Sequence, residues 1–450
     1  MSESKKLTLK SIRTSLFSRG LSVARLGVGA GLKYASTKIS SSSMDDFLTD
    51  QAVLFSKEFG ELKGSLMKAG QMLSMYGEYF FPPAANQILK SLQSDSPALD
   101  WSVMRQHLEL YLSEDKLSEL DIDPVAIGCA SLGQVHKAKI RSTGEWIVLK
   151  IQYPHVDKAI DSDLKTLKTL LKISRLLPEG IDLDPVFREV KKMLLQELDY
   201  IAEARLTKQY ADKLSGDSRF RVPKVYDNYS GPKVLATEFL EGFKADHPLV
   251  QSLSQKRRNQ LSENFLQLYL REIFEWNLVQ TDPHLGNYKI HIDPLGQDQL
   301  VLLDFGAVSN FSELFISAYR RMIKGSVEHN EAVFLAAARD LGFVIDSDSP
   351  EYIQTFSTFC YETVEPFWTT DDPRNTKGKV KADNLYNWKQ TDLPGRVVQR
   401  AWQFKNFDLR SPPQEILFLD RKTGGVFIFL SVLGAEINAR KIIEPFLSKV

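Results

Sequence analysis

The sequence has few cysteines, no net charge and no long apolar run. Its 450 residues include two cysteines, too few for a disulfide framework or a cysteine-rich metal cluster, so a reducing compartment is the simplest expectation. The 57 Lys and Arg residues balance 57 Asp and Glu residues, which argues against a general nucleic-acid binder. No apolar run reaches the roughly 20 residues of a membrane-spanning helix. The best candidate, 424–435, is about half that length, and we expect it to form a buried helix.

The composition is that of a folded protein, with 43% hydrophobic and 25% charged residues. The length fits two or three domains, or one two-lobed catalytic unit. We divide the chain into a basic N-terminal segment (1–45), a helical extension (46–120), a lobe that contains strands (121–242) and a mostly helical lobe (243–450).

The first 40 residues carry eight Lys and Arg residues and a single acid, Glu3. Apolar residues are spaced among these cations, as in a helix that lies on an anionic membrane. The same composition suits a transit peptide, or a helix that packs on the protein through its apolar stripe. The sequence leaves these three readings open.

The strongest motif pair is TDPHLGN (281–287) followed by LLDFGAV (302–308). Asp282 and Asn287 have the D-x-x-x-x-N spacing of a kinase catalytic loop, and Asp304 begins a DFG 22 residues after Asp282. Phosphoryl transfer needs a carboxylate to orient the attacking oxygen and hard oxygen ligands to hold Mg²⁺ between phosphates. We therefore predict that Asp282 is catalytic and that Asn287 and Asp304 bind the metal. The alternative is two acidic turns that end strands.

A lysine on a predicted strand completes the set. WIVLK places Lys150 17 residues after Gly133, as in the V-A-I-K strand whose lysine reaches the α- and β-phosphates. Val148 and Lys150 share one face of this strand, and Ile147 and Leu149 share the other. An ammonium beside an inward valine needs an anionic partner, which favours a functional lysine over an exposed edge-strand lysine.

The loop before this strand is bounded by Gly128 and Gly133 but lacks the lysine of a P-loop. Its position before the strand lysine is that of a kinase glycine-rich loop, whose backbone covers the phosphates. We take five of its residues as candidate ATP contacts: Ala130, Ser131, Gly133, Gln134 and Val135. In the later strand KVLATEFLEG, Glu238 is a further candidate.

The lysine also needs a carboxylate on a helix. The segment QELDYIAEA offers Glu197, Asp199 and Glu203, of which Asp199 and Glu203 are four residues apart and are expected to share a helical face. Two like charges on one face call for more than one cation, so we expect Lys68 of the extension to join Lys150 there. The alternative is an ordinary solvated face.

Six motifs in order resemble the UbiB/AarF family of atypical kinase-like proteins. They are KAGQ (68–71), ASLGQVH (130–136), LKIQYP (149–154), ELDYIAEA (197–204), QTDPHLGN (280–287) and LLDFG (302–306). The resemblance runs from about residue 60 to the C-terminus. One departure is that Gly128 and Cys129 stand where family members commonly have alanine.

The resemblance implies an α+β fold: a bilobal protein-kinase-like fold with an N-terminal helical extension packed over the active site. It implies that Lys150 pairs with Glu203, and that ATP (or ADP) and Mg²⁺ are the cofactors. It also implies a regulatory extension whose residues lie near one another: Lys68, Gln71, Glu197 and Asp199.

The same resemblance implies a role in ubiquinone biosynthesis at a membrane. The expected partners are anionic membrane lipids, with ubiquinone-biosynthesis proteins or lipid intermediates. The expected location is peripheral: the cytoplasmic face of the membrane in a bacterium, or the matrix side of the mitochondrial inner membrane in a eukaryote. We expect no transmembrane span and no nucleic-acid partner, and the sequence does not specify an oligomeric state.

Three functions remain open at this stage. An ATPase or small-molecule kinase is favoured because Lys150, Asp282, Asn287 and Asp304 are all retained. A nucleotide-binding pseudokinase scaffold would not need all four. A protein kinase is disfavoured because no A-P-E follows the DFG, and a helix that Ser309 or Ser312 caps is expected within a few residues.

Overall fold

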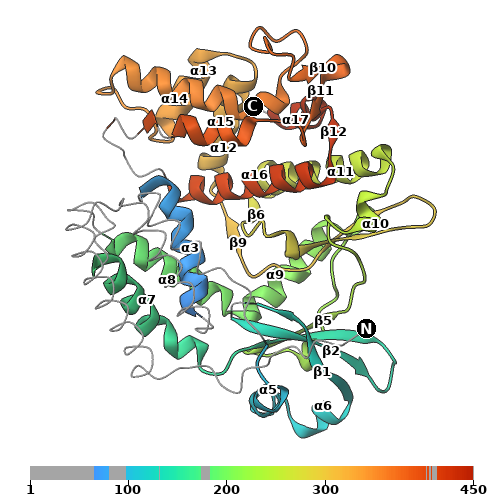
Figure 1. Ribbon diagram of the computed structural model, residues 1–450. Helices are drawn as coiled ribbons and strands as arrows, with labels where there is room; N and C mark the ends of the chain where they lie inside the picture. The colour runs from blue at the N-terminus through green and yellow to red at the C-terminus, as the bar shows by residue number, and fades with distance from the viewer. Residues whose placement is uncertain are drawn as a thin grey trace, which may run out of the picture. The chain divides into compact units, whose positions relative to one another are not determined.

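The computed structural model describes residues 65–80, 98–130, 132–173, 183–401, 403–404, 407 and 413–448 (Figure 1). The basic segment 1–45 lies outside these residues, so its predicted helix is not addressed. The described residues up to Asp212, together with Pro223–Phe239, form one compact unit, called unit 1 below. Lys213–Val222 and the described residues from Leu240 onward form unit 2.

Unit 1 contains a four-stranded antiparallel sheet in the order β1-β2-β3-β5. Its strands are β1 (Leu120–Cys129), β2 (Gly133–Ile140), β3 (Trp146–Gln152) and β5 (Val234–Glu238). The predicted hairpin of β2 and β3 is confirmed, whereas β5 ends earlier than expected. Ile147, Leu149 and Ile151 are fully buried on the core face of β3. Val148 and Lys150 are half-buried on its other face, so the valine that we expected to point inward does not belong to the core.

The helices of unit 1 are α3 (Ser65–Phe80), α5 (Trp101–Leu108), α6 (Glu114–Ser118), α7 (Val156–Ile173), α8 (Asp184–Glu197) and α9 (Tyr200–Lys213), with the short 3-10 helix η1 (Asp227–Tyr229). Within the extension, the described helices are α3, α5 and α6, joined by non-helical residues at 98–100 and 109–113. Helix α3 packs against α7 and α8 (Figure 1). It buries Leu66, Ala69, Met72 and Leu73, which recur at helical spacing on one face.

Unit 2 is mostly helical. Its helices are α10 (Pro248–Gln251), α11 (Gln255–Phe274), α12 (Glu313–Val327), α13 (Glu331–Asp340), α14 (Pro350–Thr363), α15 (Leu393–Ala401), α16 (Gln414–Leu433) and α17 (Ala439–Leu447), with 3-10 turns η2 (Leu285–Asn287), η3 (Glu365–Phe367) and η4 (Ala382–Asn384). Its strands are β4 (Phe220–Arg221), β6 (Leu278–Gln280), β7 (Tyr288–His291), β8 (Gln299–Leu302), β9 (Val308–Asn310), β10 (Val380–Lys381), β11 (Leu385–Asn387) and β12 (Glu436–Ile437). The parallel pairing of β4 with β8 explains why Lys213–Val222 belongs to this unit.

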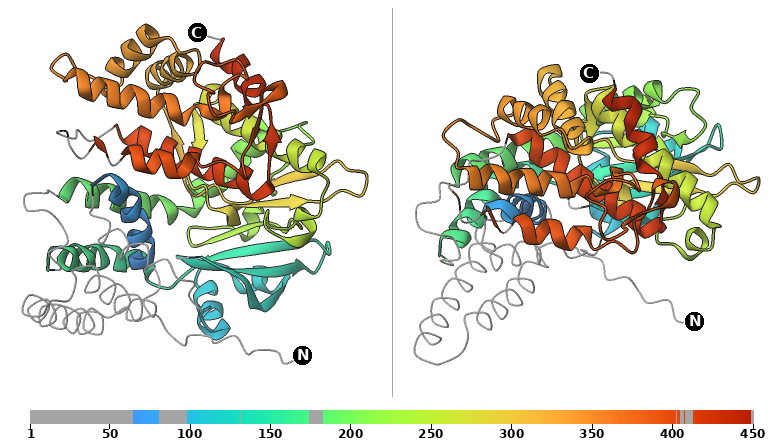
Figure 2. Two further views of the ribbon diagram at one scale, coloured as in Figure 1. Left: turned by 45° about the horizontal axis from the view of Figure 1, so that its top comes forward. Right: turned by 90° about the horizontal axis from the view of Figure 1, so that it is seen from above.

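The core of unit 2 forms where α11 meets α16 and α17 (Figure 2). Leu261, Phe265 and Leu268 of α11 are buried, and the Phe265 and Phe429 rings lie 4.1 Å apart between their centroids. Helix α16 ends at Gly434, whose left-handed backbone (φ 62°) is one that glycine adopts without cost. This packing fixes α16 against α11.

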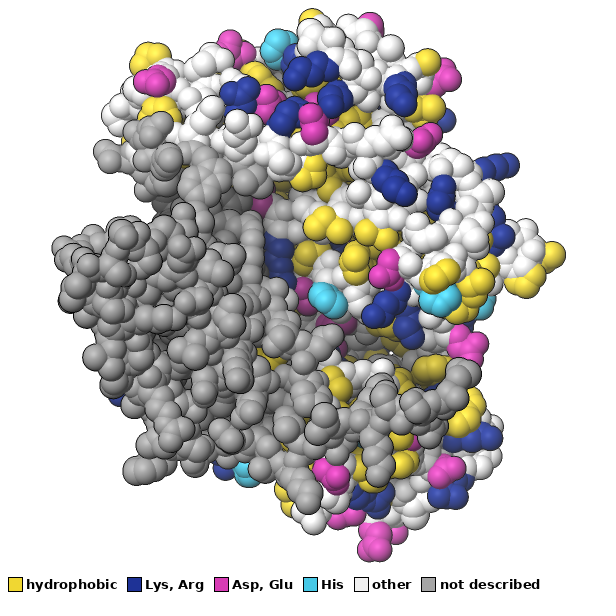
Figure 3. All heavy atoms as spheres, in the orientation of Figure 1, with side chains coloured by type: hydrophobic (Ala, Val, Ile, Leu, Met, Phe, Trp, Pro, Cys, Tyr) yellow, Lys and Arg dark blue, Asp and Glu magenta, His cyan; other side chains and the backbone are white. Residues whose placement is uncertain are grey.

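Helix α16 contains most of the apolar run 424–435, which is helical as predicted, but only six of its twelve residues are buried. Lys422, Val426, Phe429 and Leu430 lie on its inner side. Apolar side chains also gather over α16 on the face drawn in Figure 3. Ile428 of α16 is 56% exposed. Among the described helices, none is both long and apolar enough to cross a membrane.

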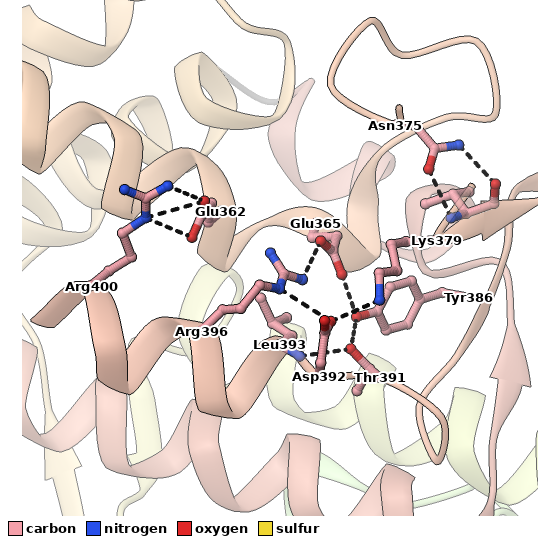
Figure 4. Close-up of polar contacts among 11 residues, drawn as sticks. Glu362, Glu365, Asn375, Lys379, Tyr386, Thr391, Asp392, Leu393, Arg396 and Arg400 are labelled. Carbon is pink, nitrogen blue, oxygen red and sulfur yellow. Dashed lines mark hydrogen bonds and ion pairs between the residues drawn. The ribbon is translucent and has the colours of Figure 1, made fainter. Parts of the chain in front are cut away.

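A polar network joins α14, α15 and β11 (Figure 4). Arg400 pairs with Glu362 at 2.9 Å, Arg396 pairs with Glu365, and the Tyr386 hydroxyl donates to Glu365 Oε1 at 2.8 Å. Its members are Glu362, Glu365, Lys379, Tyr386, Thr391, Asp392, Arg396 and Arg400. The charges of the network are matched within it, so it holds α15 in place and offers no excess charge for a ligand.

Candidate functional site

The turn between β1 and β2 is tight. The backbone N–H of Ala130 donates to Gly133 O at 2.8 Å. A Cβ on Gly133 would overlap Ile151 O and lie 3.0 Å from the Tyr200 hydroxyl. Glycine is therefore required here because β2 packs closely on β3 and α9. Ser131, the middle of this loop, lies outside the described residues.

Two further loop candidates continue into β2. Gln134 is fully buried: its amide oxygen accepts from Leu99 N at 2.9 Å, and its amide nitrogen donates to Leu99 O at 3.3 Å. The Gln134 side chain thus ties the extension to the sheet, and an ATP contact from this residue would have to use its backbone. Val135 is half-buried and lies opposite Lys150 in the β2–β3 register.

The structure brings Lys150 of β3 and Glu203 of α9 together. Lys150 Nζ donates to Glu203 Oε1 at 2.7 Å, and the Lys150 ammonium lies 5.2 Å from the centroid of the Tyr200 ring. The Glu203 side chain is 2% exposed and that of Lys150 is 20% exposed. The buried carboxylate pairs with the ammonium, while the partly exposed lysine can still contact an anion from solvent.

A second ion pair links the extension to α8. Lys68 Nζ lies 2.8 Å from Glu197 Oε1, and their side chains are 9% and 17% exposed. Gln71 lies one turn further along α3, half-buried. The expected face shared by Asp199 and Glu203 is wrong, because α9 begins only at Tyr200. Asp199 is exposed and caps this helix by accepting from Ala202 N at 2.9 Å. Lys68 contacts Glu197, one of the carboxylates that the resemblance placed near it.

Glu238 closes β5 and is half-buried. Its carboxylate Oε2 accepts from the backbone N–H of Lys224 at 3.3 Å, and its own N–H donates to Lys224 O at 2.8 Å. Its side chain is therefore used within unit 1. An ATP contact at Glu238 stays a prediction.

In unit 2, the hairpin of β7 and β8 aligns the two motif segments. Tyr288 pairs with Leu302, and Leu303 N donates to Asn287 O at 3.0 Å, so Asn287 and Asp304 emerge at the same end of the hairpin. Asp304 Oδ1 accepts from Gly306 N at 2.9 Å. The pairing of the two strands predicted between the motifs therefore brings the two motifs together.

Asn287 also fixes the catalytic loop. Its side-chain Nδ2 donates to Asp282 O at 3.0 Å and to Asp282 Oδ2 at 3.3 Å. Since the nitrogen faces Asp282, the amide oxygen is the Asn287 atom that would meet a cation. The described residues contain no group of three or more His, Cys, Asp and Glu side chains suited to a metal. Asn287 and Asp304 fit Mg²⁺, which binds through one or two protein oxygens, substrate phosphates and water.

A buried polar cluster, which no sequence motif predicted, lies beneath this loop. Lys422 Nζ lies 3.0 Å from Glu272 Oε2 and donates to Gln280 Oε1 and to the Tyr288 hydroxyl oxygen, each at 3.2 Å. Lys422 and Glu272 are each only 2% exposed. Gln280 Nε2 in turn donates to Asp282 O at 2.7 Å. The cluster therefore reaches the catalytic loop directly.

Charge in this cluster is compensated. Burial lowers the pKa of Lys422, but the Glu272 carboxylate and Tyr288 outweigh burial and raise it above its ordinary value. Burial, with the nearby Glu272 carboxylate, raises the pKa of Tyr288 to about 12. Lys422 is thus cationic and Tyr288 neutral near pH 7. A glutamate among apolar residues of α11 was the signal that could have revealed the cluster.

A family model described as "ABC1 atypical kinase-like domain" matches residues 91–337. The matched range contains every predicted catalytic and metal residue. It ends before α16, so Arg421 and Lys422 lie beyond it.

Several fungal and animal proteins are similar over most of this chain. The mitochondrial atypical kinase COQ8 of Saccharomyces cerevisiae is 30% identical, and the match covers 100% of this chain and 88% of that protein. The mitochondrial atypical kinase COQ8 of Schizosaccharomyces pombe is 31% identical, with 86% of this chain and 61% of that protein covered. The chain thus spans less than two thirds of the length of the fission-yeast protein.

Among solved structures, the complex of Rv3197 with erythromycin from Mycobacterium tuberculosis has a TM-score of 0.56 to this chain. The alignment covers 90% of this chain and 98% of that chain at 24% identity. At this identity the likeness shows the fold alone, and it supports the predicted α+β kinase-like fold.

Proposed function

The chain belongs to the UbiB/AarF family of atypical kinase-like proteins, and from this premise we propose that it binds ATP with Mg²⁺ and either transfers the γ-phosphoryl group to a small acceptor or hydrolyses ATP at a membrane. The observation that carries the proposal is the 2.7 Å ion pair between Lys150 and the buried Glu203. An enzyme needs this lysine held in one orientation for the phosphates, whereas a scaffold gains little from a buried carboxylate dedicated to that task.

Each candidate residue has a physical role in this proposal. Lys150 meets the α- and β-phosphates and Glu203 orients it, while Asn287 and Asp304 supply oxygens to Mg²⁺. Bound Mg²⁺ would neutralise charge between the phosphates. Asp282 orients the hydroxyl or water that attacks the γ-phosphorus and accepts its proton.

The segment after the DFG supports a small acceptor over a peptide. Six residues, 307–312, separate Gly306 from the start of α12 at Glu313, and three of them form β9. Ser312 caps α12 by accepting from Phe315 N at 3.2 Å. A segment this short and this ordered has no length for the peptide-binding platform that protein kinases build between DFG and A-P-E.

The setting is proposed from the family and from the relatives. The family resemblance leads us to propose a role in ubiquinone biosynthesis, with biosynthetic proteins or lipid intermediates as partners. The names of the COQ8 relatives lead us to propose a mitochondrial location. The family resemblance leads us to propose the matrix side of the inner membrane. The basic N-terminal segment would add attraction to anionic lipids, about 1 kcal/mol per cation near the surface.

The test is ATP turnover by the purified full-length chain in Mg²⁺, with and without anionic liposomes. We expect turnover in the wild type, and we expect Asp304→Asn to abolish Mg²⁺-dependent nucleotide binding while circular dichroism shows a folded protein. Asp346→Asn is the matched control, because the Asp346 side chain is fully exposed, with a relative exposure of 102%. Wild-type ATP affinity of Asp304→Asn in Mg²⁺ would refute the metal assignment. Nucleotide binding without turnover under every condition would support the scaffold instead.

A further inference from the structure

Helix α16 lies directly against the catalytic loop. A Cβ on Gly425 would overlap Pro283 Cβ, so only glycine lets the helix approach the loop this closely. One turn earlier, Lys422 anchors the same helix to β6 and β7 through Gln280 and Tyr288. The position of α16 relative to Asp282 is therefore fixed at two adjacent points.

Arg421, next to the anchored lysine, contacts the catalytic aspartate. Arg421 Nη2 donates to Asp282 Oδ1 at 2.7 Å, and the two side chains are 17% and 13% exposed. The other carboxylate oxygen, Oδ2, receives Asn287 Nδ2 at 3.3 Å. Gln280 and Asn287 both donate to the backbone carbonyl of Asp282. The carboxylate is thus held through both oxygens and through its own backbone.

We propose that Arg421 is a positioning residue for Asp282, an inference that rests on the proposed phosphoryl transfer. Rotation about the terminal bond of an aspartate is soft, so an unheld carboxylate samples a wide range of angles. The guanidinium holds one oxygen, and the geometry then directs the remaining lone pairs of the carboxylate to the acceptor. In phosphoryl transfer most of the catalysis is positioning and charge stabilisation, so this orientation acts on the chemical step.

A purely structural ion pair makes a different prediction. In that case Arg421 would fasten α16, and its loss would lower stability without a specific effect on turnover. The anchors described above argue against this, because Lys422 and Gly425 already fix the helix at this place. Arg421 is also more exposed than Lys422, at 17% against 2% of the side chain.

The experiment compares Arg421→Ala and Arg421→Gln with wild type in ATP turnover, nucleotide affinity and thermal stability. We expect kcat to fall by about 100-fold in both variants, the loss typical of a misplaced catalytic group. KM for ATP and Mg²⁺-nucleotide affinity should stay near wild type. The matched control is Arg440→Ala, because Arg440 is 20% exposed and pairs only at 3.7 Å with Glu444 on the same helix.

Chemical rescue separates positioning from packing. Low-millimolar guanidinium should restore part of the kcat of Arg421→Ala, and methylammonium at equal concentration should not, since it lacks the planar donor pair. If Arg421→Ala does not fold, Arg421→Gln decides by its kcat alone. Wild-type kcat in a folded Arg421 variant, or a loss of stability without a loss of kcat, overturns the inference. Absence of turnover in the wild type itself would overturn the proposed function and this inference with it.

Discussion

The pair of Lys68 and Glu197 makes a prediction whose size follows from burial. Lys68→Met keeps the aliphatic stem against α8 but removes the ammonium that lies 2.8 Å from Glu197. Breaking a buried ion pair from one side costs about 3–5 kcal/mol, because the remaining charge is left uncompensated. Glu197 keeps 17% of its side chain exposed, so we take the lower end, about 3 kcal/mol.

This cost should appear as local opening. Helix α3 is still held to α7 and α8 by Leu66, Ala69, Met72 and Leu73, so the chain as a whole stays folded. A change of about 3 kcal/mol multiplies the opening equilibrium of α3 by roughly 100-fold. Amide hydrogen exchange within 65–80, followed by mass spectrometry, should therefore accelerate by that factor. If the extension also shields the site, incubation with ATP should give new phosphosites on the protein.

A double variant tests whether the ion pair of Lys68 and Glu197 holds α3. Lys68→Met with Glu197→Gln replaces the charged pair by neutral groups of similar size, and should recover most of the lost protection. Lys192→Met is the control, since Lys192 is 72% exposed and its pair with Glu189 at 3.8 Å should contribute under about 1 kcal/mol. If the double variant exchanges as fast as the single variant, the ion pair does not hold α3. If Lys68→Met shows neither faster exchange nor new phosphosites, the gating role of the extension should be abandoned.

Three further outcomes are expected. Lys150→Ala should weaken Mg²⁺-ATP binding by about tenfold or more, the size of a charge-assisted hydrogen bond. Glu203→Ala should weaken binding in the same way when measured by calorimetry. If Glu203→Ala leaves the affinity unchanged while Glu197→Ala lowers it strongly, the lysine has another partner. His136 is buried as the neutral ring, and burial keeps its pKa below the ordinary value, so the unfolded chain takes up the proton first. The stability that is present above about pH 6.5 is therefore lost as pH falls, by up to about 1.4 kcal/mol per pH unit. Urea titrations of wild type and His136→Asn should show a smaller slope of unfolding free energy against pH in the variant, and equal slopes would exclude His136 as the cause. Deletion of 1–40 should reduce co-sedimentation with anionic liposomes, more at low salt than at high salt, and unchanged sedimentation would refute membrane attraction by this segment.

Local patterns predicted the parts of the site that local structure creates. Alternation of apolar and polar residues, with turn residues between, predicts structure within about 30 positions. It predicted the β2–β3 hairpin, the place of Lys150 on its second strand, and the strands between Asn287 and Asp304. The face shared by Asp199 and Glu203 failed for a local reason. Asp199 is a strong capping residue, and it ended the helical repeat that the spacing alone suggested.

The contacts that α16 makes with the catalytic loop could not be predicted in the same way. Arg421 and Asp282 are 139 residues apart, and an Arg-Lys pair in a helix ordinarily belongs to a solvated face. Gly133 shows the same limit, since its close approach to Ile151 and Tyr200 depends on how β2 packs on β3 and α9. Such contacts are set by tertiary packing, which no single segment encodes.

The buried cluster around Lys422 has a consequence for how the protein is made. Lys422 follows Tyr288 by 134 residues, so at synthesis rates of about 5–20 residues per second it emerges roughly 7–27 s later. Until then the Lys422 ammonium, which lies 3.0 Å from Glu272 in the folded protein, is missing, and burying the Glu272 carboxylate without this ammonium is costly. We therefore expect the cluster beneath the catalytic loop to form only after α16 has been synthesised. Chaperones would then bind a lobe that contains all of its motifs but has not completed its fold. A ribosome that stops before codon 421 would release such a lobe, complete in its motifs and unfinished in its fold.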